Sequence, residues 1–179
     1  QTFNLTTGVD AFTGGAGNDT FSAGDISGGS SFTASDVLDG GAGSDTLTIS
    51  QTAAFSGGPA GAKISNIETV NISSGGAITL NTTTDTAGFT GMTALTTSTT
   101  GAAQTVTTGT AVNLTVNDSS QAATNVGING GKAVTVNSTG VSTGTITIGA
   151  TTAAKGAVVV SDTGSATVNA GTHGAIAVT

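Results

Sequence analysis

The chain carries two copies of one nine-residue pattern, Gly14–Ser22 with the sequence GGAGNDTFS and Gly40–Thr48 with the sequence GGAGSDTLT. Both copies fit GGxGxDxUx, where U is a large apolar residue. The similarity begins upstream of the glycines, because Asp10 precedes the first copy as Asp36 precedes the second. Phe12 matches Leu38 in the same way, so every matched pair has the same separation along the chain.

This spacing suits a cation-binding loop. Glycine permits backbone torsions that a Cβ would block, so that carbonyl oxygens can converge on an ion. The aspartate adds the anionic oxygen that a hard divalent cation prefers, and the apolar residue two positions later begins a strand that points into a core. The alternative is a pair of glycine-rich turns in which aspartate is an ordinary turn residue, although turns need no aspartate on both sides of the glycines.

The distribution of charge agrees with a bound cation. The net charge is −7, and six of the ten acids lie within the first 45 residues. Folding these carboxylates together requires a countercharge, yet the only cations are Lys63, Lys132 and Lys155. So few basic residues exclude a nucleic-acid-binding protein. The chain has no cysteine, so neither disulfides nor thiol chemistry are available.

Short apolar strands separated by Gly, Asn, Ser and Thr follow from about residue 69. Val116 and Val136, Ile128 and Ile148, and Ile148 and Val168 each recur at a spacing of about 20 residues. Two strands in each coil of this length predict an all-β, right-handed parallel β-solenoid or β-roll. We therefore predict a motif segment over 1–62 and a Thr/Gly-rich solenoid segment over 63–179, together forming one continuous domain. The residues that mark the strands are Val70/Ile72, Ile78/Leu80, Val112/Leu114/Val116, Val126/Ile128, Val134/Val136, Ile146/Ile148, Val158/Val160, Val168 and Ile176/Val178.

Two places are less regular. Phe89, Met92 and Leu95 lie at spacing three within Thr82–Thr100, which predicts one short helical or 3₁₀ turn, weakened by neighbouring glycines. Glu68 stands alone in an otherwise uncharged stretch and is interpreted as a solvated or strand-edge carboxylate, with a third metal ligand as the alternative. Five of the six phenylalanines fall in the first third of the chain, where we expect them to fill the core.

Catalysis finds no support in the sequence. His173 is the only histidine and lies in a turn sequence, where a solvated side chain is the usual case. No cysteine is available as a nucleophile, and paired carboxylates occur only within the two motifs, so we expect no enzyme. No apolar run approaches the length of a transmembrane helix. The first residues lack the features of a signal peptide, and we expect a processed product or a segment of a longer chain.

The order of these features resembles the RTX-type surface-layer proteins of Caulobacter and related proteobacteria. It is the RTX pair, then ISNIETVN from Ile64 to Asn71, then a Thr/Gly/Ala-rich β array that includes Ala77–Thr82 and Gly101–Val106. The resemblance implies the start of the lattice-forming region of a protein that is exported by type I secretion. Such a protein would lie outside the cell, in a calcium-dependent surface layer built from copies of itself. Its anchor would belong to regions outside this chain.

The same resemblance implies the ligands of Ca²⁺. Side-chain ligands would be Asp10, Asp19, Asp36 and Asp45, and backbone carbonyl ligands would be Gly15, Gly17, Gly41 and Gly43. Residues 23–35 separate the two copies, whereas tandem RTX repeats follow at nine-residue intervals. One or two local ions are therefore expected in place of a continuous row.

Two other functions stay open at this point. RTX motifs also occur in adhesins, so the chain could be a stalk or binding domain of a large secreted adhesin. It could also be a calcium-binding appendage of a secreted hydrolase, which would require an enzymatic domain elsewhere.

Overall fold

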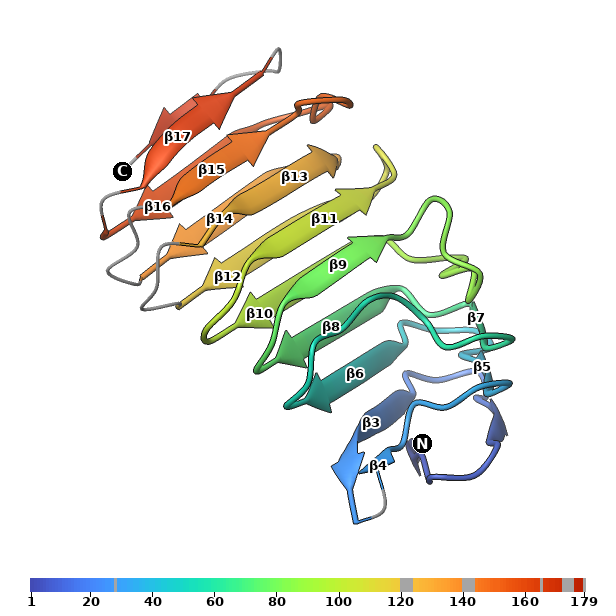
Figure 1. Ribbon diagram of the computed structural model, residues 1–179. Coiled ribbons are helices and arrows are strands. Elements are labelled where there is room, and N and C mark those ends of the chain that lie inside the picture. Colours follow the sequence, from blue (N-terminus) through green and yellow to red (C-terminus); the bar gives the residue numbers. More distant parts are fainter. Residues whose placement is uncertain (28, 120–123, 140–143, 165, 172–175, 179) are drawn as a thin grey trace.

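The computed structural model describes residues 1–179 with the exception of 28, 120–123, 140–143, 165, 172–175 and 179. Within the described residues every regular element is a β-strand, and all strand pairs but one are parallel. The chain winds through a stack of coils, with the N-terminal coils at the bottom of Figure 1 and the C-terminal coils at the top. This arrangement confirms the predicted all-β parallel solenoid. No helix that could cross a membrane occurs in the described part of the chain.

The strands form three sheets. The first sheet contains β1 (Thr2–Asn4), β3 (Thr20–Ile26), β6 (Thr46–Gln51), β8 (Thr69–Ser74), β10 (Ala94–Thr99), β12 (Asn113–Asp118), β14 (Val134–Ser138), β16 (Val158–Asp162) and β18 (Ile176–Val178), in that order, with β4 (Gly29–Ser30) antiparallel to β3. The second sheet contains β9 (Ile78–Asn81), β11 (Gln104–Thr108), β13 (Val126–Gly130), β15 (Thr145–Ile148) and β17 (Thr167–Ala170). The third sheet contains β2 (Ala11–Thr13), β5 (Val37–Asp39) and β7 (Lys63–Ser65).

The coils of the first and later parts of the stack differ in their strands, and we call them wide and narrow, although Val134 and Val158 are again 24 residues apart. In the first part of the chain each coil includes a strand of the third sheet, and equivalent residues such as Asp10 and Asp36 are 26 residues apart. In the later coils the chain passes directly from the second sheet to the first, and the paired residues Asn117 and Asn137 are 20 residues apart. The first sheet runs past residue 62 without interruption, because β6 pairs with β8.

Alternation along each strand builds the core. Inward side chains in the first sheet lie over one another coil after coil, and Phe21, Leu47, Val70 and Leu95 form one such column with at most 1% of their surface exposed. Small and β-branched side chains suit this narrow interior, since they pack well on a pleated surface. Phe21, Phe32 and Phe55 are buried, and Phe3 stacks on Phe21 with ring centroids 4.9 Å apart. The phenylalanines in the first third thus fill the core, as predicted.

The predicted strand register is correct in two places and wrong in one. Val116 pairs with Val136 and Ile128 with Ile148, as expected. Val168, however, pairs with Ile146, whereas Ile148 pairs with Ala170. The reason is that residues 149–157 between β15 and β16 form a longer connection than residues 131–133 one coil earlier.

The predicted helical turn does not form at Phe89, Met92 and Leu95; a single turn lies earlier, where the amides of Thr84 and Asp85 donate to the Asn81 carbonyl. Leu95 lies in β10, and Phe89 and Met92 are buried in the preceding irregular segment. Phe89 has a φ of 41° after Gly88 at 92°, a backbone that cannot continue a right-handed helix. The strand β10 gives a weak sequence signal because two of its inward positions are threonines, Thr97 and Thr99, which are nonetheless buried.

The columns of the core predict where a truncation is costly. Leu47 in β6 is fully buried, so Leu47→Ala should lower the free energy of unfolding by about 2–5 kcal/mol, since the cavity cannot collapse within a stacked sheet. Val37 in β5 is 45% exposed, and Val37→Ala should cost less than about 1 kcal/mol. Denaturant unfolding monitored by circular dichroism measures both. Equal costs would contradict the assigned register.

Candidate metal centre

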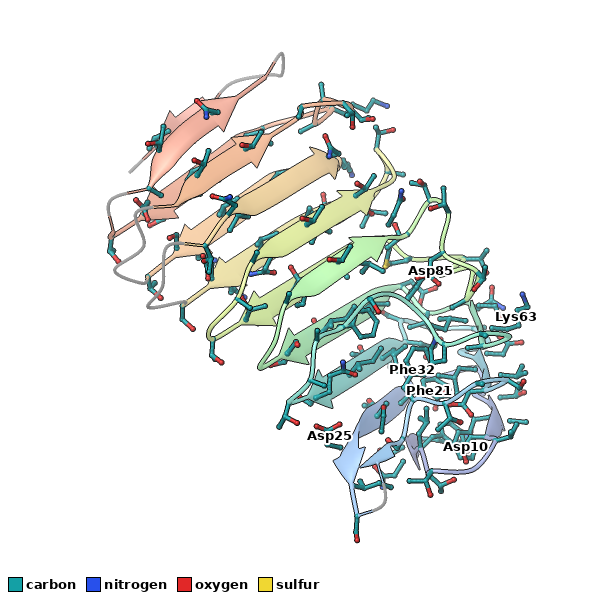
Figure 2. The ribbon with its side chains drawn as sticks, in the orientation of Figure 1. Asp10, Phe21, Asp25, Phe32, Lys63 and Asp85 are labelled. Atoms are coloured by element: carbon teal, nitrogen blue, oxygen red, sulfur yellow. The ribbon has the colours of Figure 1, made fainter. Side chains whose placement is uncertain are left out.

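The two motif loops lie one above the other at the edge where the third sheet leads into the first. Residues 14–19 connect β2 to β3, residues 40–45 connect β5 to β6, and residues 66–68 connect β7 to β8 in the next coil. Figure 2 shows Asp10 and Phe21 among the side chains of this end of the molecule, with Lys63 at its outer edge. The spacing between the two motifs is therefore the length of one wide coil.

Glycine at the first motif position is explained by the close approach of coils. A Cβ on Gly14 would overlap the carbonyl oxygen of Gly40, and a Cβ on Gly40 would overlap that of Asn66. No side chain fits against a backbone oxygen placed so close. Gly14, Gly40 and Asn66 thus occupy one position in three successive coils.

The motif aspartates hold the main chain of the neighbouring coil. The amide of Asp19 donates to Asp45 Oδ1 at 2.7 Å, and the amide of Asp45 donates to Glu68 Oε2 at 2.8 Å. The amino group of Gln1 donates to Asp19 Oδ1 in the same sense. We call this series, Asp19, Asp45 and Glu68, the carboxylate ladder. Each rung satisfies a backbone donor and a buried anion together, which a folded interior requires.

Glu68 is the member that sequence reasoning did not assign. Its register with Asp45 follows from the pairing of Thr46 with Thr69, and its separation from Asp45 is 23 residues, against 26 residues between Asp19 and Asp45. It is half-buried, accepts an amide and directly precedes β8, so of the two interpretations a strand-edge carboxylate agrees with the structure and a solvated one does not. The signal in the sequence is the T that follows D or E in NDT, SDT and IET.

Asp10 and Asp36 form a separate pair at the entry to the third sheet. The amide of Asp10 donates to Asp36 Oδ1 at 2.9 Å, and Asp36 Oδ2 accepts the amide of Thr33 at 2.6 Å. Asp10 Oδ2 accepts the amide of Thr6 at 2.7 Å. The structure therefore brings the four predicted aspartates together as two pairs, 10 with 36 and 19 with 45. Across the described residues, no three or more acidic, histidine or cysteine side chains cluster as metal ligands.

Two of the four predicted carbonyl ligands, those of Gly15 and Gly17, face the adjacent loop, and the contacts of the Gly41 and Gly43 carbonyls do not test their assignment. The carbonyl oxygen of Gly15 accepts the amide of Ala42 at 2.9 Å and lies 2.5 Å from the position of a Gly41 Cβ. The carbonyl oxygen of Gly17 lies 2.6 Å from the position of a Gly43 Cβ. These two carbonyl oxygens therefore lie between the two motif loops, and the Gly15 oxygen already accepts one hydrogen bond, from the Ala42 amide.

One oxygen atom in this region fits a cation. Asp45 is fully buried, and its Oδ2 has no hydrogen-bond partner among the described residues. This atom and the carbonyl oxygen of Asn66 both lie within 2.5 Å of the position that a Gly40 Cβ would occupy, so the two oxygens converge beside Gly40. In the first motif the equivalent Asp19 Oδ2 already accepts the amide of Gly15 at 2.7 Å. At the second motif loop, Asp45 Oδ2 and the Asn66 carbonyl would supply one anionic and one carbonyl oxygen to a hard cation such as Ca²⁺, which takes about six to eight oxygen ligands in all.

Other acids of the wide coils also hold main-chain amides. Asp25 Oδ2 accepts the hydroxyl and the amide of Thr52, each at 2.6 Å, and these bonds hold the pKa of Asp25 below its ordinary value. Asp85 Oδ2 accepts the amide of Gly58 at 2.8 Å. The pKa of Asp19 is lowered first by its hydrogen bond from the Gln1 amino group and then by that from Gly15. The clustered acids are therefore stabilised largely by backbone N–H groups.

Asp118, which lies outside the motifs, is buried at the end of β12, where its carbonyl accepts the amide of Thr139. His173 lies outside the described residues. Comparison with known proteins adds no assignment, since neither a protein-family model nor a curated protein matches the chain.

The motif glycines provide a test that separates close packing from ligand function. Gly43 has a φ of 137° and lacks room for a Cβ, whereas a Cβ on Gly17 would meet nothing within 4 Å. Gly43→Ala should cost about 1–3 kcal/mol of unfolding free energy through backbone strain. Gly17→Ala should stay within about 0.5 kcal/mol of the parent. Both are measured by urea unfolding without calcium, and equal losses would show that the loops are not stacked as described.

The bonds from Thr52 to Asp25 predict a dependence on pH. Because the folded state holds the pKa of Asp25 below its unfolded value, this group stabilises the fold above about pH 4 and loses that contribution as the pH falls further. The decrease in urea midpoint from pH 6 to pH 3 should be smaller in Asp25→Asn than in the parent. Thr52→Ala, which removes the hydroxyl donor, should reduce it in part. An unchanged decrease in both variants would contradict the assignment.

Proposed function

We propose that the chain is a structural component of a calcium-dependent bacterial surface layer, in which a β-solenoid stiffened by Ca²⁺ assembles with copies of itself. The observation that carries this proposal is the carboxylate ladder. Its carboxylates tie successive coils together by accepting main-chain amides. One oxygen of the buried Asp45 carboxylate, Oδ2, has no donor among the described residues. The resemblance to RTX surface-layer proteins supports an extracellular location and an anchor supplied by other regions.

Calcium would act on the second motif loop. When bound, it would neutralise the Asp45 carboxylate and link it to a main-chain carbonyl, for which Asn66 is the best-placed oxygen. Asp45 and Glu68 hold successive coils through Asp19 and Asp45 amides, so an ion there would stiffen the wide coils as a unit. Asn66 has a φ of 51°, a conformation that asparagine tolerates better than most residues.

The architecture supports assembly by its repetition. The first sheet extends by adding one parallel strand for each coil, and β1 at one end pairs only with β3 among the described strands. A sheet edge of this kind accepts a further coil, from the same chain or from another copy. Acids concentrated in the wide coils oppose the approach of like molecules until calcium lowers their charge.

The role of calcium is tested by two variants at Asp45 and a remote control. Asp45→Ala removes the acceptor of the Asp19 amide and should cost about 1–3 kcal/mol with or without calcium. Asp45→Asn keeps an acceptor oxygen but loses the charge, so it should match the parent in EGTA. Unlike the two Asp45 variants, the parent should gain stability from calcium, by about 2.7 kcal/mol at a hundredfold excess over Kd. Asp162→Asn, which changes an acid that caps its own turn, should respond to calcium as the parent does.

Assembly is measured on the same proteins by light scattering and electron microscopy during a calcium titration. Ordered arrays should form over the concentration range in which the parent gains stability, and sodium at equal ionic strength should not replace calcium. A melting temperature that is unchanged by EGTA would sink the calcium site. Calcium binding without arrays would remove the lattice function and favour the stalk of an adhesin.

A further inference from the structure

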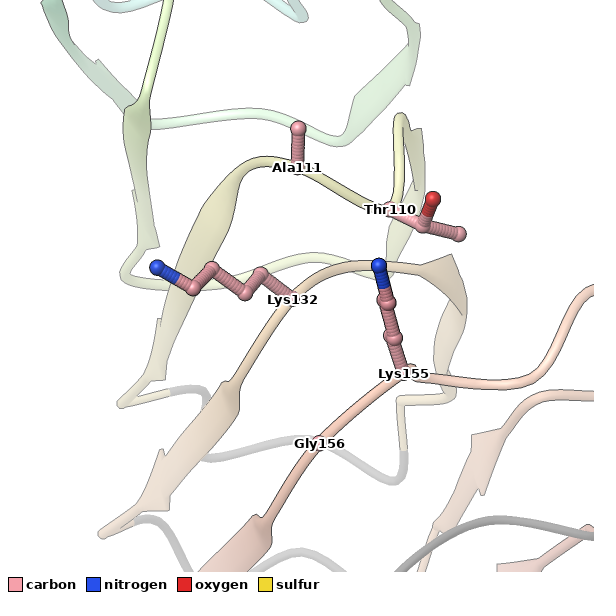
Figure 3. Close-up of a pocket in the computed structure, with 5 residues that line it drawn as sticks. All are labelled: Thr110, Ala111, Lys132, Lys155 and Gly156. Atoms are coloured by element: carbon pink, nitrogen blue, oxygen red, sulfur yellow. The ribbon is translucent and has the colours of Figure 1, made fainter.

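The narrow coils carry a hollow of about 470 Å³ that is lined by two of the three cations of the chain. Thr110, Ala111, Lys132, Lys155 and Gly156 form its lining, and Figure 3 shows the side chains of Lys132 and Lys155 extending in different directions from adjacent coils. We call it the lysine hollow. It lies where the chain turns from the second sheet into β12, β14 and β16.

Sheet register places the lysine hollow on the same edge of the solenoid as the carboxylate ladder. The pairing of strands in the first sheet aligns Asp45, Glu68, Thr93, Val112 and Lys132 at one position of successive coils. The amide of Lys132 donates to the carbonyl of Val112 at 2.7 Å, in agreement with this alignment. This edge of the molecule therefore changes from anionic in the wide coils to cationic in the narrow ones.

The charge of the lysine hollow is not compensated locally. Residues 109–112, 131–133 and 149–157, which form this edge, contain no acid. The nearest acids in sequence, Asp118 and Asp162, end β12 and β16, roughly 13–17 Å along the strands from their beginnings. Neither lysine ammonium has a hydrogen bond or ion pair within the described part of the chain. Both side chains are exposed, so a ligand can reach them.

The backbone keeps the lysine hollow open. The amide of Lys155 donates to the carbonyl of Gly131 at 2.9 Å, which fixes the two lysines on neighbouring coils. A Cβ on Gly156 would lie 2.6 Å from the carbonyl oxygen of Lys132, so this position of the lining cannot carry a side chain. The result is a recess with small, uncharged walls, a threonine hydroxyl and two cations at its rim.

We propose that the lysine hollow binds a carboxylate-bearing ligand of monosaccharide size, such as a hexuronic acid. An ammonium forms charge-assisted hydrogen bonds to a carboxylate, and Thr110 offers a hydroxyl to a polyhydroxylated ligand. The volume lies within the range of small-molecule sites, about 300–1,000 Å³. Because the site is open and its contacts are few, the affinity is weak and depends on salt. This function is independent of the calcium-dependent assembly proposed above.

The experiment titrates the intact chain with glucuronate and follows amide chemical shifts by NMR, with glucose as the uncharged probe. Chemical-shift changes should concentrate at Thr110, Lys132 and Lys155. The affinity for glucuronate should fall several-fold between roughly 50 and 500 mM salt, because added salt shortens the Debye length, which is about 10 Å at roughly 0.1 M. In Lys132→Gln/Lys155→Gln the affinity should fall at least tenfold. Lys63→Gln is the matched control, since Lys63 is exposed on a wide coil and donates to the Thr86 carbonyl.

Several results would overturn the proposal. Equal shifts with glucose would remove the role of the carboxylate, and binding that survives in the double variant would place the site elsewhere. Circular dichroism shows whether the double variant is folded, as expected for two exposed side chains. If glucuronate does not bind but the double variant abolishes concentration-dependent sedimentation, the lysine hollow is a contact between copies of the chain. Loss of glucuronate binding with intact calcium-dependent arrays would leave the proposed function standing.

Discussion

Parallel stacking in register places each residue of one coil directly over its counterpart in the next, about 4.8 Å away. Every column must therefore satisfy the same steric and electrostatic requirements several times over. Apolar columns such as Phe21, Leu47 and Val70 satisfy them by packing. The column of Gly14 and Gly40 satisfies them by having no side chain where the carbonyl of the next coil lies. The first glycine of the motif is therefore required by the short distance between successive coils.

Charged columns present the hardest case, since stacked carboxylates repel and buried ones need donors. In the carboxylate ladder each carboxylate accepts the N–H of the equivalent residue in the preceding coil. Every anion thus has at least one donor, and an amide lies between it and the next carboxylate. In Asp45, however, the second oxygen remains without a donor among the described residues. Within the carboxylate ladder, Asp45 Oδ2 is thus the buried carboxylate oxygen that lacks a donor, which is why the calcium proposal centres on that residue.

The change in coil width separates two regions with different surfaces. The third sheet ends at β7, and beyond it the turns into the first sheet no longer contain glycine-rich motif loops. The column that carried Asp45 and Glu68 then carries Lys132, so one edge of the molecule bears opposite charges at its two ends. Rigid stacking keeps these regions apart, because neither can move across the intervening coils. Calcium and an acidic ligand would accordingly be bound at separate places.

The stacked parallel β architecture, the width of the first coils and most inward positions could be predicted from the amino-acid sequence. The match of Phe12 with Leu38 and the period-two alternation are local signals of a repeated unit. Three other features became visible only in the folded chain: the pairing of Ile146 with Val168, the place of Glu68 in the carboxylate ladder, and the alignment of Lys132 with the acids. Each of these depends on the lengths of the connections between strands, and no periodic signal encodes those lengths. A small change in the length of one turn moves every later side chain to a new neighbour.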